Sequence, residues 1–162
     1  MKILVLSDTH VPTRGRQLPP FVERALRESP DLIVHAGDVV SEAIIDYLLT
    51  FAPVEAVAGN MDRVPVSDRL PRERVITCQS MTIGLVHGDG YSESALREAF
   101  GHVDIVIFGH THKPHLEFFE GQWFFNPGSP VDPRGGSQPA FGWIQIEDDL
   151  SFSVVNAGRS HH

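Results

Sequence analysis

Polar residues of the kinds that bind metal ions follow five short apolar runs of this sequence. These segments are Asp8-Thr9-His10, Gly37-Asp38, Gly59-Asn60, His87-Gly88 and Gly109-His110-Thr111-His112. Their nitrogen and oxygen donors, without sulfur, suit Mn, Fe, Ni, Co or Zn better than Ca or Mg and do not single out one metal. The candidate ligands are Asp8, His10, Asp38, Asn60, His87, His110 and His112.

Seven ligands are too many for one ordinary metal site. They suit two ions roughly 3.5 to 4 Å apart that share a carboxylate, an arrangement used for in-line displacement at phosphorus. Asp38 is the expected bridge, because it is the Asp that follows the second apolar run. His110 and His112, one residue apart, are expected to project to the same side of extended backbone.

A simpler interpretation applies to each residue alone, since a single Asp or His at a strand end is most often a cap or a turn residue. Five such endings in one chain favour a shared metal site. His35 and His102 are interpreted as core or surface histidines, and His115 as a strand residue.

The elements that must position these residues alternate between strand and helix. Strands are predicted at 3–6, 32–34, 54–58, 83–86 and 104–108, and apolar stripes at helical spacing lie between them, near 21–26, 44–49 and 95–100. Such alternation predicts an α/β fold. Because ligands of open α/β sheets lie beyond the carboxyl ends of the strands, the polar segments are expected to converge.

After residue 114 the sequence predicts antiparallel strands joined by tight turns, and residues 72–86 are predicted to form another hairpin. We therefore predict one domain over residues 1–158, with two mixed β-sheets packed as a sandwich and flanked by helices. Residues 159–162 are predicted to be a tail, and His161 and His162 suggest the remnant of a purification tag.

Composition narrows the class of protein. The 162 residues carry a formal net charge of −8, which disfavours binding to duplex nucleic acid. Cys78 is the one cysteine, so no internal disulfide forms and a reducing compartment is expected. No apolar run approaches the roughly 20 residues of a membrane span, and a cytoplasmic protein without membrane contact is expected. The sequence does not set the oligomeric state.

In their order and spacing, the five polar segments resemble the motifs of the calcineurin-like metallophosphoesterases. The matching residues are Asp8-x-His10, Gly37-Asp38, Gly59-Asn60-x-Asp62, His87-Gly88 and Gly109-His110-x-His112. The short length and the turn Asn126-Pro127-Gly128-Ser129 resemble the minimal bacterial and archaeal phosphodiesterases of that superfamily. The resemblance covers the chain from Asp8 to about Arg134.

The resemblance implies a dinuclear, metal-dependent phosphoesterase that acts on a small phosphoester, with a metal-bridging hydroxide as the nucleophile. Asn60 would also touch a phosphate oxygen and, with Asp62, is a candidate catalytic residue. Among the metals that fit, manganese is favoured, with Ni, Fe, Co and Zn as alternatives. One ion would be held by Asp8, His10, Asp38 and His112, and the second by Asp38, Asn60, His87 and His110.

One position departs from the family pattern. Many members have His where this chain has Met61, and Met cannot donate a proton to a leaving group. Its absence costs about a hundredfold for poor leaving groups, so good ones are favoured. Asp62 has two open roles, to orient a neighbouring residue or to cap its loop.

The net charge of the expected site favours one class of substrate. Two divalent ions carry four positive charges, and two Asp carboxylates and a hydroxide offset three of them, which leaves about one positive charge and favours a diester over a monoester.

Other functions are kept or set aside on specific residues. A metal-binding scaffold or protein-interaction module of the same fold, with little activity, is the main alternative. Dinucleotide binding is disfavoured at His87-Gly88-Asp89-Gly90-Tyr91-Ser92-Glu93, because Glu93 replaces a small residue and would repel pyrophosphate. A serine hydrolase is disfavoured because the chain lacks a G-x-S-x-G segment.

Overall fold

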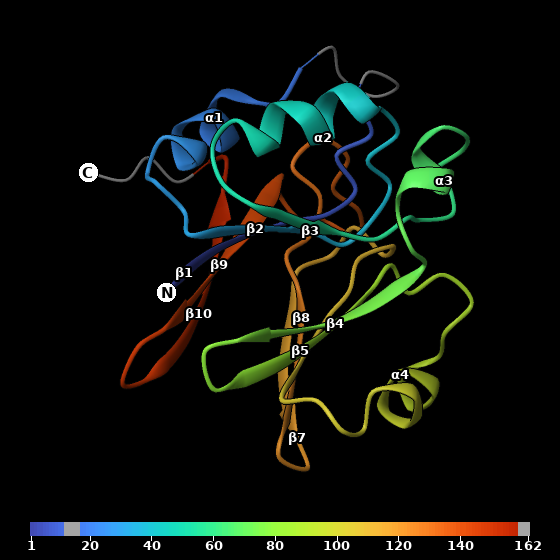
Figure 1. Cartoon of the computed structure of the whole chain (residues 1–162), viewed down its shortest axis with the longest axis vertical. Helices are drawn as coiled ribbons and strands as arrows, with labels where there is room; N and C mark the ends of the chain where they lie inside the picture. The colour runs from blue at the N-terminus through green and yellow to red at the C-terminus, as the bar shows by residue number, and fades with distance from the viewer. Residues whose placement is uncertain (12–16, 159–162) are drawn as a thin grey trace.

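Two five-stranded mixed sheets form the centre of the molecule in a computed structural model, which describes residues 1–11 and 17–158 (Figure 1). The first sheet has the order β10-β9-β1-β2-β3 and the second β4-β5-β6-β8-β7. The first contains β1 (Lys2–Leu6), β2 (Leu32–His35), β3 (Val54–Ala56), β9 (Ala140–Ile146) and β10 (Leu150–Asn156). The second contains β4 (Glu73–Cys78), β5 (Met81–Val86), β6 (Ile105–Ile107), β7 (His115–Phe119) and β8 (Gln122–Asn126). The predicted sandwich of two mixed sheets is confirmed.

Parallel pairing places the polar segments at one end of the sandwich. Strands β1, β2 and β3 pair in parallel, as do β5, β6 and β8, while β9, β10, β4 and β7 pair antiparallel with their neighbours. Strand β8 thus joins the parallel part of its sheet through β6, although the sequence indicated only antiparallel pairing after residue 114.

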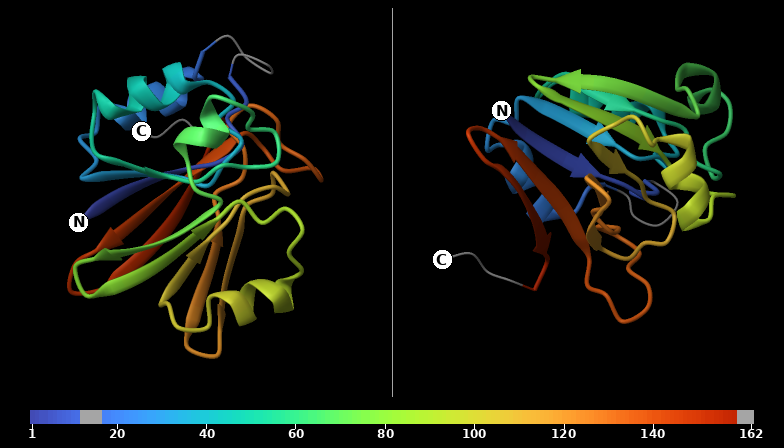
Figure 2. Two further views of the ribbon diagram at one scale, coloured as in Figure 1. Left: turned by 45° about the vertical axis from the view of Figure 1, so that its right-hand side comes forward. Right: turned by 90° about the horizontal axis from the view of Figure 1, so that it is seen from below.

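Helices cover the outer faces of both sheets, as Figure 2 shows from the side. Helices α1 (Pro20–Leu26) and α2 (Glu42–Leu49) lie on the first sheet, and α4 (Glu93–Ala99) lies on the second. Ser41 and Ser92 cap α2 and α4, because their hydroxyl oxygens accept backbone N–H groups of Ala43 and Ala95. A short helix α3 (Val66–Arg69) was not predicted. No helix within the described residues is long and apolar enough to cross a bilayer.

Three apolar clusters hold these layers together. The cluster between the sheets contains fully buried Ile3, Val5, Val34, Ile105 and Phe125, while two further clusters pack the helices on the outer faces. Alternate residues of β1 therefore face opposite sides, so Leu4 packs under α1 and α2 while Ile3 and Val5 pack against the second sheet. Burial on both faces fixes the register of the central strands and hence the position of the residues that follow them.

Candidate metal centre

Four predicted ligands lie together in the space where the two sheets meet. Asp8, His10, Asp38 and His112 each offer a ligand atom, and these atoms all lie within 4.8 Å of one another. All four residues are buried. Asp8 and His10 follow β1, Asp38 follows β2, and His112 follows β6, so both sheets contribute. These four are the residues that the family resemblance assigns to one ion.

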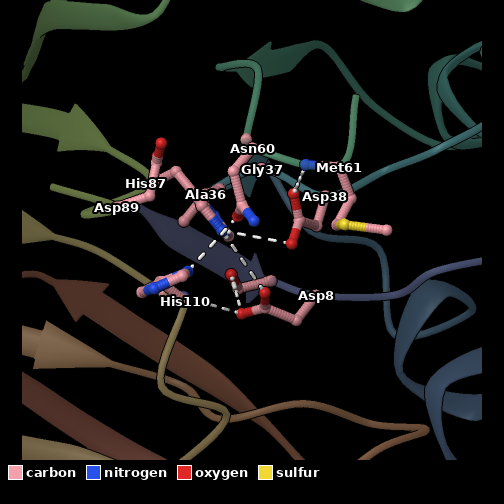
Figure 3. A network of polar contacts seen from close by, with 12 residues as sticks. Asp8, Ala36, Gly37, Asp38, Asn60, Met61, His87, Asp89 and His110 are labelled. Carbon is pink, nitrogen blue, oxygen red and sulfur yellow. Dashed lines mark hydrogen bonds and ion pairs between the residues drawn. The ribbon is translucent and has the colours of Figure 1, made fainter. Parts of the chain in front are cut away.

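The two carboxylates each have one oxygen fixed by the protein and one directed at imidazoles (Figure 3). Asp8 Oδ2 accepts hydrogen bonds from Ser7 Oγ at 2.7 Å and from the backbone N–H of His110 at 3.0 Å. Asp38 Oδ1 accepts the backbone N–H of Met61 at 2.8 Å. The other oxygen of Asp38 lies 3.4 Å from His10 Nε2 and 3.2 Å from His87 Nε2. Asp38 therefore lies between imidazoles of the two expected ligand sets.

The remaining three predicted ligands adjoin this cluster. His87 Nε2 lies 3.6 Å from Asp8 Oδ1, and the rings of His87 and His110 lie 5.3 Å apart between centroids. His110 Nδ1 lies 3.3 Å from Asn60 Oδ1. Asn60 is exposed and His110 is half-buried, so this side of the site faces solvent. All seven predicted ligands thus meet at one place.

Hydrogen bonds to backbone carbonyls orient two of the imidazoles. The Nδ1–H of His87 donates to Ala36 O at 2.7 Å, and the Nδ1–H of His112 donates to Asp132 O at 2.6 Å. In both rings Nε2 is then the nitrogen that points at the carboxylates. Metal-binding histidines usually carry such a bond on the other ring nitrogen, which fixes the tautomer and the ring orientation.

Unpaired polar atoms at the centre of the cluster show that the residues fit a cation. Asp8 Oδ1, both ring nitrogens of His10, and His87 Nε2 are buried without a hydrogen-bond partner among the described residues. A buried polar atom without a partner costs about 1–3 kcal/mol, so four at one place require an explanation. Divalent cations bound by carboxylate and imidazole provide that explanation.

The charges of the cluster also change its proton equilibria. Burial opposes ionisation of Asp8, yet the nearby imidazoles of His10 and His112 keep the pKa of Asp8 well below its usual value. Burial likewise opposes a charged His87, but the close approach of the Asp38 carboxylate and the charge of Asp8 raise the pKa of His87 to about 8. Without metal, the positive charge of a protonated His87 therefore offsets part of the negative charge of Asp8 and Asp38.

Several ligand residues have unusual backbone conformations. Asp8, His10, Asp38, His110 and His112 have φ between 45° and 71°, in the left-handed region that side chains rarely adopt. The expectation of extended backbone at His110 and His112 is therefore wrong, because each has φ above 55°. Left-handed turns bring both imidazoles back over the strand ends. Such strain costs about 1–3 kcal/mol per residue and persists where the surrounding structure over-determines it.

Two glycines allow the polar segments to approach one another. A Cβ at Gly59 would collide with the carboxylate of Asp38, and one at Gly109 would collide with Ser7 Oγ and with Asp8 Oδ2. The backbone next to Asn60 and His110 can therefore touch the carboxylates directly only because both positions lack a side chain.

Asp62 lies beneath the site and contacts backbone groups. Its Oδ2 accepts N–H groups of Asp38 at 2.9 Å, Val39 at 3.3 Å and Gly59 at 2.8 Å. Its Oδ1 accepts the N–H of Val40 at 2.6 Å. One buried carboxylate thus ties the loop after β2 to the loop after β3.

Other residues that support the site were not predicted from the sequence. Ser129 Oγ donates to Asp8 O at 2.7 Å, and Asn126 Nδ2 donates to Gly109 O at 3.0 Å. His35 is buried between Thr9 and Gly37: its Nδ1 accepts the Gly37 N–H, and its Nε2–H donates to Thr9 Oγ1 at 3.0 Å. The turn Asn126-Pro127-Gly128-Ser129 could have indicated the roles of Asn126 and Ser129. No comparable signal surrounds His35, which is a single histidine within the segment VHAGD.

The family was then identified by comparison with known proteins. The profile of the calcineurin-like phosphoesterase superfamily domain matches residues 1–149. The chain belongs to the calcineurin-like phosphoesterase superfamily. A probable metallophosphoesterase of Methanothermobacter thermautotrophicus is 41% identical over 165 residues, covering 98% of this chain and 94% of the relative. A probable metallophosphoesterase of Methanocaldococcus jannaschii is 38% identical, covering 96% of this chain and 81% of the relative.

Solved structures of this superfamily share the fold. The zinc complex of Vps29 from Entamoeba histolytica superposes with a TM-score of 0.78 at 27% identity, over 96% of this chain and 99% of that one. Membership of this superfamily implies that the protein binds divalent metal ions. The buried cluster around Asp8 and His112 offers a suitable set of ligand atoms. A metal-dependent phosphoesterase is thus the class to which this chain belongs.

Proposed function

We propose that the protein is a phosphodiesterase that uses two divalent transition-metal ions, with manganese favoured. The observation that carries the proposal is the buried group of Asp8, His10, Asp38 and His112, which His87, His110 and Asn60 adjoin, with four buried polar atoms there lacking hydrogen-bond partners among the described residues. When bound, such ions lower the pKa of water and offset negative charge on a phosphate.

The site residues would have three roles: they would bind the two ions, contact the phosphate and hold the loops in position. Asp8, His10, Asp38 and His112 would hold one ion, and Asp38, Asn60, His87 and His110 the other. The position of Asp38 Oδ2 within 3.4 Å of both His10 Nε2 and His87 Nε2 supports its role as the bridge. Asn60, exposed at the open side, would donate its amide N–H to a phosphate oxygen. We assign Asp62 to positioning, since the contacts of its carboxylate are with backbone N–H groups.

The choice of a diester with a good leaving group follows from two features. Met61 is exposed and offers no proton to a leaving alkoxide, so esters of acidic alcohols should react best. Asp8 and Asp38 remove part of the metal charge, which leaves a site suited to a monoanion.

The test combines metal content with hydrolysis. Purified full-length protein loaded with Mn²⁺ is expected to hold two ions per chain and to hydrolyse bis(p-nitrophenyl) phosphate. Asp38→Asn should lose both ions and at least about a hundredfold in kcat/KM, because it weakens a shared ligand. His110→Ala should retain close to one ion. Asp46→Asn, an exposed carboxylate on α2, is the matched control and should behave as the wild type.

A second candidate function has one supporting observation. The similarity to Vps29 chains favours a metal-binding protein-interaction module of the same fold. Two tightly held ions without turnover of any phosphoester would favour that module, whereas wild-type hydrolysis by Asp38→Asn would contradict the bridging role.

A further inference from the structure

A cavity of about 390 Å³ opens beside the candidate metal centre. Gly88, Gly109 and His110 line its end at the metal centre, while Leu96 of α4 and Phe124 of β8 line another part of its wall. Small-molecule sites typically have volumes of about 300–1,000 Å³, so this cavity is large enough for an organic group. Since His110 belongs to both the ligand set and the cavity wall, a group attached to a phosphate at the metal centre would have room here.

The wall of the cavity is rich in exposed ring surface. Phe108 follows β6 directly, lines the cavity and remains half-buried although it is large and apolar. Tyr91 lines it from the loop before α4 and is 37% exposed, with its hydroxyl held at 3.1 Å by Glu73. Covering such rings with an apolar ligand removes their surface from water and is favourable by about 25 cal/mol per Å². Flat aromatic ligands add stacking or edge contacts with the rings.

The charged residues of the cavity largely pair with one another. The Arg97 guanidinium lies 3.3 Å from Glu117 and 3.9 Å from Glu93, and Glu117 also lies 3.2 Å from His115. Within the described part of the chain, the Lys113 ammonium makes no ion pair and is the cation of the wall that remains uncompensated. An uncharged ring in the cavity, attached to an anionic phosphate outside it, matches this arrangement.

Resting on the proposed phosphoesterase activity, we propose that this cavity binds an aromatic ester group of the substrate and that Phe108 determines this specificity. The substrate class is then a phosphodiester in which at least one ester oxygen carries an aromatic or heteroaromatic ring. Diesters of two small alkyl alcohols would leave Phe108 and Tyr91 uncovered and would bind more weakly.

Calorimetric titration with two phosphonates tests the proposal without relying on turnover. Methyl benzylphosphonate and methyl methylphosphonate are both monoanions, and their P–C bonds resist hydrolysis; the benzyl methylene replaces an ester oxygen. The Mn²⁺-loaded wild type should bind the benzyl compound at least about tenfold more tightly, as expected for a hydrophobic subsite. Phe108→Ala should reduce this ratio below threefold with little change for the methyl compound.

Two further variants separate a local effect from a general one. Tyr91→Ala acts from a different segment and should reduce the ratio at least threefold, which keeps the test decisive where Phe108→Ala folds poorly. Phe118→Ala removes another exposed phenylalanine, on β7 outside the cavity wall, and should keep the wild-type ratio.

The outcomes distinguish this inference from the proposed function. Equal affinity of the wild type for both phosphonates, binding of neither, or a ring preference that survives in both cavity variants would overturn the inference. Hydrolysis of bis(p-nitrophenyl) phosphate together with any of those results would leave the proposed function intact. A ring preference that depends on Phe108, in a metal-loaded protein that hydrolyses no phosphoester, would instead refute the proposed activity and retain the binding site.

Discussion

The carboxylate of Asp62 illustrates how a residue outside the ligand set can organise the site. It accepts four backbone N–H groups from two loops, and these loops carry Asp38 and Asn60. Among them is the N–H of Val40, a β-branched residue held at φ 75°. A charged acceptor at this position therefore offsets the strain of the loop after β2 and fixes where Asp38 points.

We predict that Asp62→Ala destabilises the metal-free protein by about 3 kcal/mol or more, because four N–H groups lose their acceptor. Urea unfolding in the presence of a chelator measures this change. Asp68→Asn, an acidic position on α3 in the same part of the chain, should change stability by less than about 0.5 kcal/mol. Stability equal to that of the wild type in Asp62→Ala would remove the positioning role.

His35 provides a pH-dependent contribution at the same scale. Complete burial, which outweighs the attraction of nearby carboxylates, lowers the pKa of His35 to about 4. Above pH 6.5 the imidazole is neutral in both the folded and the unfolded protein. As pH falls below 6.5, the unfolded chain takes up a proton that the folded protein does not, so stability decreases until about pH 4.

The expected loss from this one group is about 2 kcal/mol between pH 7.5 and pH 5. His35→Gln should therefore lose about that much less than the wild type over the same interval, as measured by urea unfolding of metal-free protein at both pH values. The exposed His102→Gln should follow the wild-type pH dependence. Parallel pH dependence of wild type and His35→Gln would contradict the assignment of a neutral His35.

At the scale of elements, loops at the carboxyl ends of strands carry the candidate ligands, and a distant loop supports them. Ser129 Oγ donates to the backbone oxygen of Asp8 and accepts the N–H groups of Val131 at 3.3 Å and Asp132 at 2.9 Å. The backbone oxygen of Asp132 in turn accepts the Nδ1–H of His112. One buried hydroxyl therefore connects the loop after β8 to ligands of both sheets.

Removal of this hydroxyl should loosen the metal centre while the strands remain formed. We predict that Ser129→Ala weakens Mn²⁺ binding about tenfold or more, the usual size of outer-shell effects, measured by calorimetric titration of metal-free protein. Ser151→Ala, an exposed serine on β10, is the matched control. Unchanged Mn²⁺ affinity in Ser129→Ala would show that the loop does not position His112.

The strands and the approximate place of the site could be predicted from the sequence. Short apolar, β-branched runs that are each followed by a polar turn are typical of buried strands, and the polar turns then lie at the carboxyl ends of those strands. Ile3–Leu6 and Ile83–Val86 are such runs, and β1 and β5 include them. Strand β3 is shorter than predicted, since Ala58 donates its N–H to Pro71 O instead of continuing the ladder. Helix α3 escaped prediction because four residues carry no periodicity.

The finer geometry of the site depends on interactions between distant segments, which no local pattern contains. The left-handed backbone at His110 and His112 occurs at residues other than glycine and matches no helical or strand period. Three of the four bonds of Asp62 join residues 22 to 24 positions apart, and the fourth is the local bond to Gly59. The sequence thus identified the candidate ligands, whereas the contacts that hold these residues in place could not be predicted from it. The predicted tail 159–162 lies outside the described residues, and the single-domain assignment over 1–158 remains a prediction.

For the whole molecule, the candidate metal centre lies where the two sheets meet. Asp8, His10 and Asp38 follow strands of the first sheet, while His87 and His112 follow strands of the second. This junction contains two buried carboxylates and several imidazoles. Among them, Asp8 Oδ1, both ring nitrogens of His10 and His87 Nε2 have no hydrogen-bond partner among the described residues. Ions bound there would act as cross-links between the sheets and would favour the folded state over the unfolded chain.

We predict that each bound Mn²⁺ ion, at about one hundred times its dissociation constant, raises the free energy of unfolding by about 2.7 kcal/mol. For a chain of this length each ion should raise the melting temperature by about 5–10 °C relative to chelator-treated protein. Differential scanning calorimetry measures both states, and a single transition in each would show that the sheets unfold together. His112→Ala should lose at least the part of the increase that one ion contributes, whereas His115→Ala, on exposed β7, should retain all of it. A melting temperature that Mn²⁺ leaves unchanged in the wild type would contradict a metal centre between the sheets, because any ion held by the folded protein alone must stabilise it.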